Sequence, residues 1–278
     1  KAWVKSSTDQ IHNISVQGPN SRKILEKFVW TPPIQPTIKE LMKPFEKELS
    51  YYQIENMIPT NGFWTEESPV NWKSIRDVDN EGYHVPMAHP SLQDLYGSSY
   101  FDEPYIDGIS KSQGKFNKNG GRSWSVRNYK KISQPYKILP QNLKRTWNYY
   151  GIFPNFVIAT TPEVVQFYQE FPITINKSLL RGAIYKHKDE TRQQKIARYL
   201  SYRIDQDTIE EDIQLTIWSN ESMSSKSFEG FFLSDLEYGI KTHHDHLKQI
   251  LPILNLNEKP QEKEMVNINK QFLLKEVS

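Results

Sequence analysis

The sequence predicts an α+β protein, and three observations support this prediction. Runs rich in β-branched and aromatic residues follow one another with turn residues between them, as in an antiparallel meander; they cover 155–160, 164–171 and 179–185. A long helical pattern then extends from Glu190 to about Ser219. A second helical pattern extends from Ser234 to Leu251, where Pro252 ends it.

Shorter elements precede this meander. Residues 11–17 alternate in polarity as a strand does, and the first segment, 1–36, is too short to fold alone. An amphipathic run at 38–45 predicts a short helix, and residues 51–72 predict strands interrupted by Pro and Gly. A helical pattern begins at Ser74 and continues to the stop at Gly97.

The composition excludes several classes of protein. Lys and Arg total 35 against 33 for Asp and Glu, a balance that argues against a protein dedicated to nucleic acid. The sequence has no cysteine, and therefore no disulfide, thiolate nucleophile or cysteine-bound metal of its own. It has no run of about 18 apolar residues, and its first residues lack the pattern of a signal peptide, so we expect a cytoplasmic protein without a membrane span.

The segment 71–90 carries the most chemical information. His84 and His89 are five positions apart, and the carboxylates Asp77 and Glu81 precede the first of them. In an undistorted helix, positions five apart differ by about 140°, so both rings reach one metal ion only if the helix ends or bends between them. Pro86 gives a reason for such a bend. The spacing by itself still favours ordinary helix histidines over metal ligands.

The rest of this segment changes that interpretation. Asn71-Trp72-Lys73 is followed by Glu81-Gly82-Tyr83-His84 and then by His89-Pro90. This string closely resembles the catalytic domain of the Rieske non-haem iron oxygenases, the α subunits of ring-hydroxylating and demethylating oxygenases. Residues 210–220 and 233–240 resemble later parts of that domain, so the resemblance extends from about residue 37 to residue 251.

The resemblance implies a metal site of two imidazoles and one carboxylate. His84 and His89 would bind Fe(II), and a distant helix would supply the carboxylate. We expect that carboxylate to be Asp212, with its neighbour Glu211 as the alternative. Such a set suits Fe(II) and leaves positions open for water, O₂ and an approaching substrate.

Two further carboxylates are candidate catalytic residues. Each ligand histidine should donate its other ring N–H to an acceptor, for which Glu81 and Asp77 are the candidates. In the family, the position of Glu81 bridges a histidine ligand of the iron to a histidine ligand of a Rieske cluster in the neighbouring subunit. Asp77 stands where many members carry Asn. The alternative for both residues is a solvated position on a helix.

The resemblance also implies a fold and a function. The implied fold is a helix-grip (START/Bet v1-like) domain, in which a curved antiparallel sheet surrounds a long helix and metal-bearing helices cover the open side. The implied activity is that of an O₂-dependent oxygenase that hydroxylates or dealkylates a small aromatic or N- or O-methylated substrate. Electrons would come from a Rieske [2Fe–2S] centre, fed by a ferredoxin or an NAD(P)H-dependent reductase. Homotrimers are usual in the family.

One part of the family pattern is missing from the sequence. A Rieske cluster needs two Cys and two His, whereas this sequence has no Cys and only His12 ahead of the motif. We expect that residues 1–36 are a remnant adjoining a missing Rieske domain and that residues 37–278 are the catalytic domain. A cluster on a separate chain is the alternative.

Two other classes of function stay open. A ligand-binding module of the same fold without turnover would bind no iron. A zinc hydrolase with His and carboxylate ligands would act without O₂ or reductant.

Three features outside this motif have ordinary explanations that we favour. His243, His244 and His246 could bind a metal, but a solvated last helix turn explains them. Residues 111–145 contain ten basic and no acidic residues and could dock an acidic ferredoxin or reductase, but a solvated, partly mobile loop explains them. Five aromatic residues could line a substrate pocket or belong to the core: Phe153, Phe156, Phe167, Tyr168 and Trp218.

Overall fold

The computed structural model describes residues 3–7, 11–17, 40, 42–228, 230, 232–256, 258, 260–261 and 263–276. Its contacts divide the chain into two compact units, Lys1–Thr37 with Lys248–Ser278, and Ile38–Leu247. Among the described residues, no helix has the length and apolar character needed to cross a membrane.

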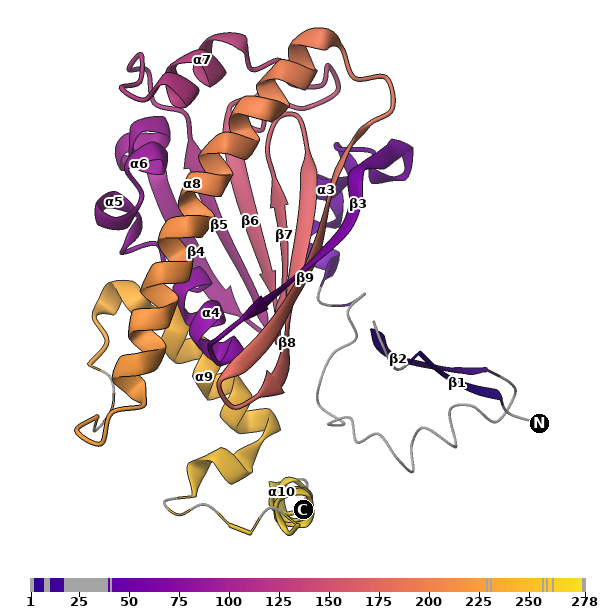
Figure 1. Ribbon diagram of the computed structural model, residues 1–278, viewed down its shortest axis with the longest axis vertical. Helices are drawn as coiled ribbons and strands as arrows, with labels where there is room; N and C mark the ends of the chain where they lie inside the picture. Colours follow the sequence, from indigo (N-terminus) through magenta and orange to yellow (C-terminus); the bar gives the residue numbers. More distant parts are fainter. Residues whose placement is uncertain are drawn as a thin grey trace. The chain divides into compact units, whose positions relative to one another are not determined.

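An antiparallel sheet of seven strands forms the centre of the unit Ile38–Leu247 (Figure 1). The strands are β3 (Met57–Ser68), β4 (Tyr100–Ile106), β5 (Ile109–Lys115), β6 (Thr146–Ile152), β7 (Phe156–Thr160), β8 (Val165–Thr174) and β9 (Lys177–His187). Their order is β3-β9-β8-β7-β6-β5-β4, so β4 to β9 form a continuous meander and β3 pairs with the last strand. The predicted meander is confirmed.

The segment 51–72 differs from its prediction because it contains one long strand. The pairing of β3 with β9 is irregular between Pro59 and Phe63, and this irregularity accommodates a proline and a glycine within a single strand.

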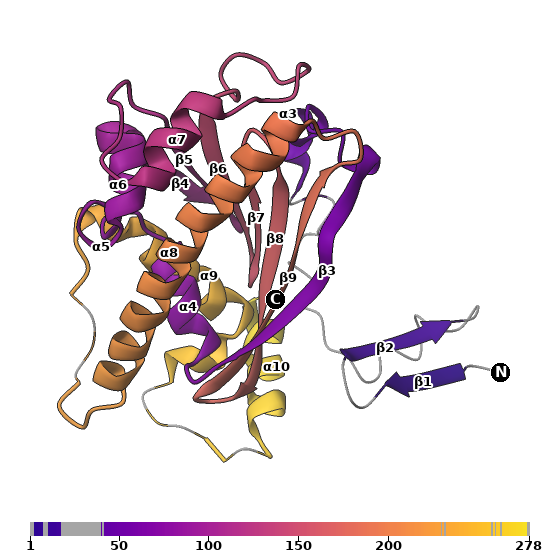
Figure 2. The same cartoon turned by 45° about the horizontal axis from the view of Figure 1, so that its top comes forward.

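Helix α8 (Arg192–Met223) crosses one face of the sheet, as Figures 1 and 2 show from two directions. It begins at a capping box in which the Thr191 side chain accepts from the Gln194 backbone and the Gln194 side chain accepts from the Thr191 backbone. Its apolar side, including Leu200 and Ile204, belongs to a core cluster with Trp147 of β6. The predicted long helix is therefore confirmed, and it extends four residues beyond Ser219.

Shorter helices cover the rest of that face. They are α4 (Trp72–Asp79), α5 (Val85–Ala88), α6 (Pro90–Tyr96) and α7 (Trp124–Ile132), with the 3₁₀ turn η3 (Gly97–Ser99). Both α6 and α7 pack against α8. The helical pattern predicted from Ser74 to Gly97 forms three short helices, because the chain leaves the helical conformation after Asp79 and again at His89.

A second core cluster contains Tyr150 and Ile152, which alternate along β6. They belong to this cluster together with Phe45 and Leu49. The latter two come from the 3₁₀ turn η1 (Lys43–Phe45) and helix α3 (Glu46–Ser50), followed by the turn η2 (Ile54–Asn56). The first part of the helix predicted at 38–45 lies largely outside the described residues, and Pro44 belongs to the 3₁₀ turn.

After α8 the chain forms the 3₁₀ turn η4 (Asp235–Glu237) and helix α9 (Tyr238–Ile250). This agrees with the second predicted helical pattern. The unit Lys1–Thr37 with Lys248–Ser278 contains the hairpin of β1 (Trp3–Ser7) and β2 (Ile11–Gln17), the turn η5 (Pro252–Asn255) and helix α10 (Met265–Glu276). The strand predicted at 11–17 is confirmed, and the division into domains at residue 36 stays a prediction.

The histidines of α9 occupy a different environment from the one predicted. His243 is 1% exposed and lies near the rings of Trp72 and Phe153. His246 stacks on Phe153 with ring centres 4.3 Å apart, and His244 Nε2 lies 2.7 Å from an oxygen of Asp77. The prediction of a solvated last turn is wrong because these residues pack against α4 and the turn after β6.

The architecture as a whole confirms the predicted α+β class. A seven-stranded antiparallel sheet with a long helix across it, and smaller helices beside that helix, is the helix-grip arrangement expected from the resemblance.

Candidate metal centre

The two histidines of the motif lie at the two ends of one short helix. His84 precedes α5, which covers only Val85–Ala88, and His89 follows it. His89 has φ −118° and ψ 81°, outside the helical region, because the following Pro90 disfavours that region for the residue before it. The bend therefore comes from Pro90. The predicted role of Pro86 is wrong, since Pro86 lies in the first turn of α5, where a proline is well accommodated.

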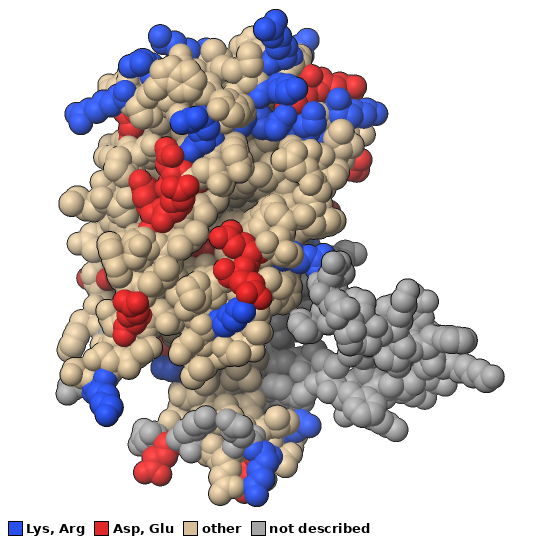
Figure 3. Space-filling model, in the orientation of Figure 1, with Lys and Arg blue, Asp and Glu red and all other residues tan. Residues whose placement is uncertain are grey.

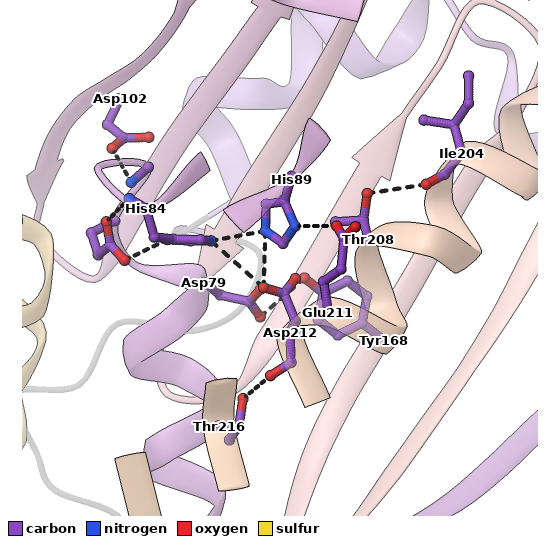
Figure 4. A network of polar contacts seen from close by, with 12 residues as sticks. Asp79, His84, His89, Asp102, Tyr168, Ile204, Thr208, Glu211, Asp212 and Thr216 are labelled. Atoms are coloured by element: carbon purple, nitrogen blue, oxygen red, sulfur yellow. Dashed lines mark hydrogen bonds and ion pairs between the residues drawn. The ribbon is translucent and has the colours of Figure 1, made fainter. Parts of the chain in front are cut away.

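The structure brings both histidines against Asp212 of α8 (Figure 4). The Nε2 atoms of His84 and His89 are 3.0 Å apart. Asp212 Oδ1 lies 3.0 Å from His89 Nε2 and 3.6 Å from His84 Nε2. His89 is buried, whereas the side chains of His84 and Asp212 are 21% and 28% exposed. Among the described residues, these three form the one group of His, Cys, Asp or Glu placed to bind a metal ion together.

The other nitrogen of each ring faces a glutamate. His84 Nδ1 lies 2.5 Å from Glu81 Oε1, and His89 Nδ1 lies 2.8 Å from Glu211 Oε2. Each Nδ1 therefore holds its proton toward a carboxylate, which leaves the lone pair of each neutral ring on Nε2. Two nitrogen lone pairs and the oxygen of Asp212 then converge, and they repel one another unless a positive charge lies between them.

The electrostatics of the three side chains agree with this requirement. Burial by itself lowers the pKa of His84, but Asp212 and Glu81 outweigh burial and raise that pKa to about 10. Burial raises the pKa of Asp212, but the two imidazoles outweigh it and hold that pKa below its ordinary value. The site thus stabilises added positive charge. Two imidazoles and one carboxylate are a donor set that fits Fe(II) or Zn²⁺.

The carboxylates around the two histidines agree with the prediction in part. Glu81 contacts His84 as expected, and its Oε2 also accepts from the His84 backbone N–H at 3.1 Å. Asp77 does not contact either ligand ring, because its carboxylate lies against His244 of α9. The second acceptor is Glu211, for which the resemblance offers only the role of alternative ligand. Asp77 therefore joins α4 to α9, and the prediction that it accepts from a ligand histidine is wrong.

Strand β4 holds the loop that carries Glu81. The Gly82 N–H donates to Asp102 Oδ2 at 2.7 Å, and the ring of Tyr100 fills the place that a Cβ at position 82 would take. Gly82 is therefore required for this close approach. The Tyr238 hydroxyl of α9 donates to the Asp102 carbonyl at 2.9 Å and fixes the same strand.

Two acidic residues near the site were missed by the sequence analysis. Asp79 accepts from the Tyr168 hydroxyl at 3.0 Å, and burial together with the charge of Asp212 raises its pKa despite the nearby Arg76. Asp205 lies two turns before Asp212 on α8, and burial raises its pKa to about 6. A spacing of seven on a long helix places two residues on one face, so this signal was available for Asp205.

Comparison with known proteins gives a family and a fold. Residues 55–253, more than two thirds of the chain, match the family model described as ring hydroxylating alpha subunit (catalytic domain). A solved quaternary ammonium Rieske monooxygenase, studied for carnitine oxidation by gut microbiota, has a TM-score of 0.59 and 17% identity over 77% of this chain. Naphthalene 1,2-dioxygenase from Rhodococcus sp. has a TM-score of 0.53 and 13% identity over 78% of this chain.

These relatives are longer than this chain. The chain spans 57% of the monooxygenase and 62% of the dioxygenase. Trimethylamine-oxide aldolase from Ruegeria pomeroyi is 58% identical over 41 residues, which are 15% of this chain and 5% of that protein. At such identities the two solved structures establish the shared fold, and the family model establishes the relationship. The chain therefore belongs to the ring-hydroxylating α subunits, the Rieske-type non-haem iron oxygenase family that its sequence predicts, and it contains their catalytic domain.

Proposed function

We propose that His84, His89 and Asp212 bind Fe(II) and that the chain is the catalytic domain of an O₂-dependent oxygenase. One observation carries this proposal. Two imidazole nitrogens and one carboxylate oxygen converge within 3.6 Å, while each imidazole is oriented from behind by a glutamate. Family membership supports iron over zinc for this donor set.

When bound, the iron supplies the activation of O₂, and the protein supplies orientation and charge. Glu81 and Glu211 fix the ring orientation and the tautomer of the two ligand histidines and increase the basicity of their Nε2 atoms. Asp212 is anchored within α8, where the Thr216 hydroxyl donates to its backbone carbonyl at 2.6 Å.

We infer that Glu81 also connects the site to an external electron source. It precedes Tyr83 and Met87, which are 57% and 90% exposed, so the Glu81–His84 side of the site lies next to exposed chain. His89, by contrast, is buried. The Glu81 carboxylate contacts a ligand histidine and lies beside this exposed chain, which supports a contact with a histidine of a Rieske [2Fe–2S] centre.

The overall reaction that we propose consumes O₂, two electrons and two protons. It inserts one oxygen atom into a C–H bond of the substrate and releases the other as water, or it adds both atoms across a ring. Insertion next to nitrogen or oxygen gives a product that loses the alkyl group. By their names, the solved relatives act on quaternary ammonium compounds and on naphthalene. A small methylated or aromatic substrate is the corresponding proposal for this chain.

The remaining components are proposals of the same kind. The Rieske centre would be carried by polypeptide outside this sequence, adjoining residues 1–36 or on a partner chain, because the sequence has no cysteine. A ferredoxin or an NAD(P)H-dependent reductase would reduce it. We also propose a homotrimer in the cytoplasm.

The test is elemental analysis of the protein after anaerobic reconstitution with Fe(II). We expect about one iron per chain in the parent, almost none in His89→Ala, and the parent content in His187→Ala, which removes a histidine bonded to a backbone carbonyl elsewhere. Circular dichroism checks that each variant is folded. Equal iron in the parent and in His89→Ala would refute the site.

The same preparations distinguish the other two functions. A ligand-binding module would take up no iron. A zinc hydrolase would be purified with zinc and would act without O₂ or reductant, whereas the proposed oxygenase requires both.

A further inference from the structure

The basic residues of 111–145 are not the mobile loop that the sequence favoured. The segment contains most of β5, and helix α7 with a serine cap, since the Ser123 side chain accepts from the Val126 N–H. The carboxylate of Asp94 accepts from the backbone N–H groups of Arg122 and Ser123 and fixes the start of this helix. The basic side chains are therefore presented by a folded scaffold.

Three cations of the segment already have structural roles. Lys111 forms ion pairs with Glu48 and Glu103. Lys130 is buried and donates to two backbone carbonyls and one side-chain amide oxygen. Arg145 donates to the Lys130 carbonyl at the end of α7. These contacts explain why those three residues are basic.

Four other cations form what we call the basic surface: Lys118, Arg122, Arg127 and Lys131. All four are exposed, and within the described parts of the chain none of their side chains forms an ion pair with an acidic residue. Figure 3 shows Lys and Arg gathered at the end of the unit Ile38–Leu247 that carries α7 and the start of α8, beside one group of acidic side chains. An array of exposed like charges costs free energy and is not explained by folding.

The charge of the whole chain is segregated. Ten of its 35 basic residues lie in 111–145, where there is no acidic residue, so the rest of the chain has 25 basic against 33 acidic residues and a formal charge of −8. The net charge of +2 is therefore the sum of a strongly basic segment and an acidic remainder. Such a distribution orients an approaching charged protein and accelerates its association.

The basic surface includes a hollow of matching chemistry. A pocket of about 330 Å³ is lined by Lys118, Lys131 and Arg145, together with Asn117 and Asn119, and its lining contains no acidic residue. This volume accepts one or two carboxylate side chains of a partner. Because Lys130 and Asn117 bond to each other in its wall, the pocket is formed before a partner arrives.

We propose that the basic surface is the docking site of an acidic electron-donor protein. This inference rests on the proposed oxygenase function, which requires two external electrons for each turnover. An acidic protein fits better than a nucleic acid, because the negative charge over the rest of the chain repels a long phosphate backbone while a compact partner contacts the basic end alone.

The test measures binding of an acidic plant-type [2Fe–2S] ferredoxin, independently of turnover. We expect the parent to bind it at 20 mM NaCl, with a Kd at least tenfold weaker at 200 mM NaCl. The double variant K118E/K131E should bind at least tenfold more weakly than the parent at low salt. The matched control K226E reverses an exposed lysine just beyond the other end of α8 and should change Kd less than twofold.

Carbodiimide cross-linking with the same ferredoxin locates the contact. We expect cross-links at Lys118 or Lys131, identified by mass spectrometry. No binding at low salt, an equal loss in K226E, or tighter binding of a single-stranded 20-nucleotide DNA than of the ferredoxin would overturn the proposal.

Iron content separates this result from that of the proposed function. K118E/K131E should retain the parent's iron, because its substitutions lie outside the metal centre. A parent that binds ferredoxin at the basic surface but no iron would refute the oxygenase and leave the docking site. A parent that binds iron but no ferredoxin would refute the docking site and leave the oxygenase.

Discussion

Three consecutive acidic residues on α8 give the sharpest test of the metal centre. Asp212 faces both Nε2 atoms, Glu211 Oε2 lies 2.8 Å from His89 Nδ1, and Glu210 is exposed. Replacing each in turn by its amide removes one negative charge from the same turn of the same helix. The three variants therefore differ only in the position from which the charge is removed.

The expected effects follow from burial and geometry. His89 is 1% exposed, so its Nδ1–H needs an acceptor, and loss of a partner behind a metal-bound histidine typically weakens metal binding about 10- to 100-fold. In Glu211→Gln the amide oxygen still accepts but carries no charge, which predicts the lower limit, about tenfold or about 1.4 kcal/mol. Glu211→Ala leaves the N–H unpaired and predicts about 100-fold, or about 2.7 kcal/mol.

The assay is an anaerobic Fe(II) titration in competition with a chromogenic chelator. Asp212→Asn should abolish measurable binding, because it removes a ligand, and Glu210→Gln should match the parent within about twofold, because an exposed charge on this turn is screened. If Glu210→Gln and Glu211→Gln lose affinity equally, the effect is general electrostatics and the specific role of Glu211 is refuted. If Glu211→Gln loses all binding while Asp212→Asn retains it, the ligand assignment is reversed.

Three more predictions concern stability and the loop of the site. Arg76→Met should lower the free energy of unfolding by about 1–3 kcal/mol in denaturant titrations at pH 7, because it leaves the buried Glu170 without its guanidinium partner 3.3 Å away. Burial already raises the pKa of Glu170 to about 8, so the carboxyl takes up a proton instead of keeping an unpaired charge. The double variant Arg76→Met/Glu170→Gln should recover part of that loss, and no measurable loss in Arg76→Met would contradict this. Burial raises the pKa of Glu163 to about 7 in the folded protein, whereas the unfolded chain has a pKa of about 4.3. Between these two values the folded state keeps a proton that the unfolded state has lost. The free energy of unfolding should therefore fall by about 3 kcal/mol as the pH rises from about 4 to 7. Glu163→Gln should remove this contribution of about 3 kcal/mol from the pH dependence, and an unchanged pH dependence would refute the assignment. Gly82→Ala should lower the affinity for Fe(II) while the protein stays folded, because the new Cβ meets the ring of Tyr100; parent-like iron binding would show that the loop has room.

Much of the fold could be predicted because its elements carry long, regular patterns. The strands from 155 to 185 and the helix from Glu190 each extend over enough residues for periodicity to identify them. The prediction for the segment from Ser74 to Gly97 does not include the breaks between its helices, because single residues cause these breaks. Residues on both sides of them favour helix, and the chain leaves the helical conformation where Gly82 passes Tyr100 and where Pro90 constrains His89.

Contacts between distant segments account for the other errors. Nothing near Asp77 in the sequence indicates that a histidine of α9, 167 residues later, takes its carboxylate. Composition favours a loop for the ten basic residues of 111–145. Asp94 and Asn117 anchor this segment through backbone and side-chain contacts, and their spacing in the sequence gives no sign of this. Long-range pairing of polar groups is thus the part of this structure that single-sequence patterns do not encode.

The choice between Glu211 and Asp212 depends on the rotational position of α8, which its apolar residues set. Adjacent helix positions point about 100° apart, so two neighbouring carboxylates cannot reach the same atom. Ile204 and Thr216 are both buried, and Asp212 lies on their side of the helix, eight residues after one and four before the other. Glu211 lies seven residues after Ile204, near enough to that side to reach the outer nitrogen of His89. The packing of α8 on the sheet therefore gives the two acids different partners, and rotation of the helix by one residue would bring Glu211 to the position of Asp212.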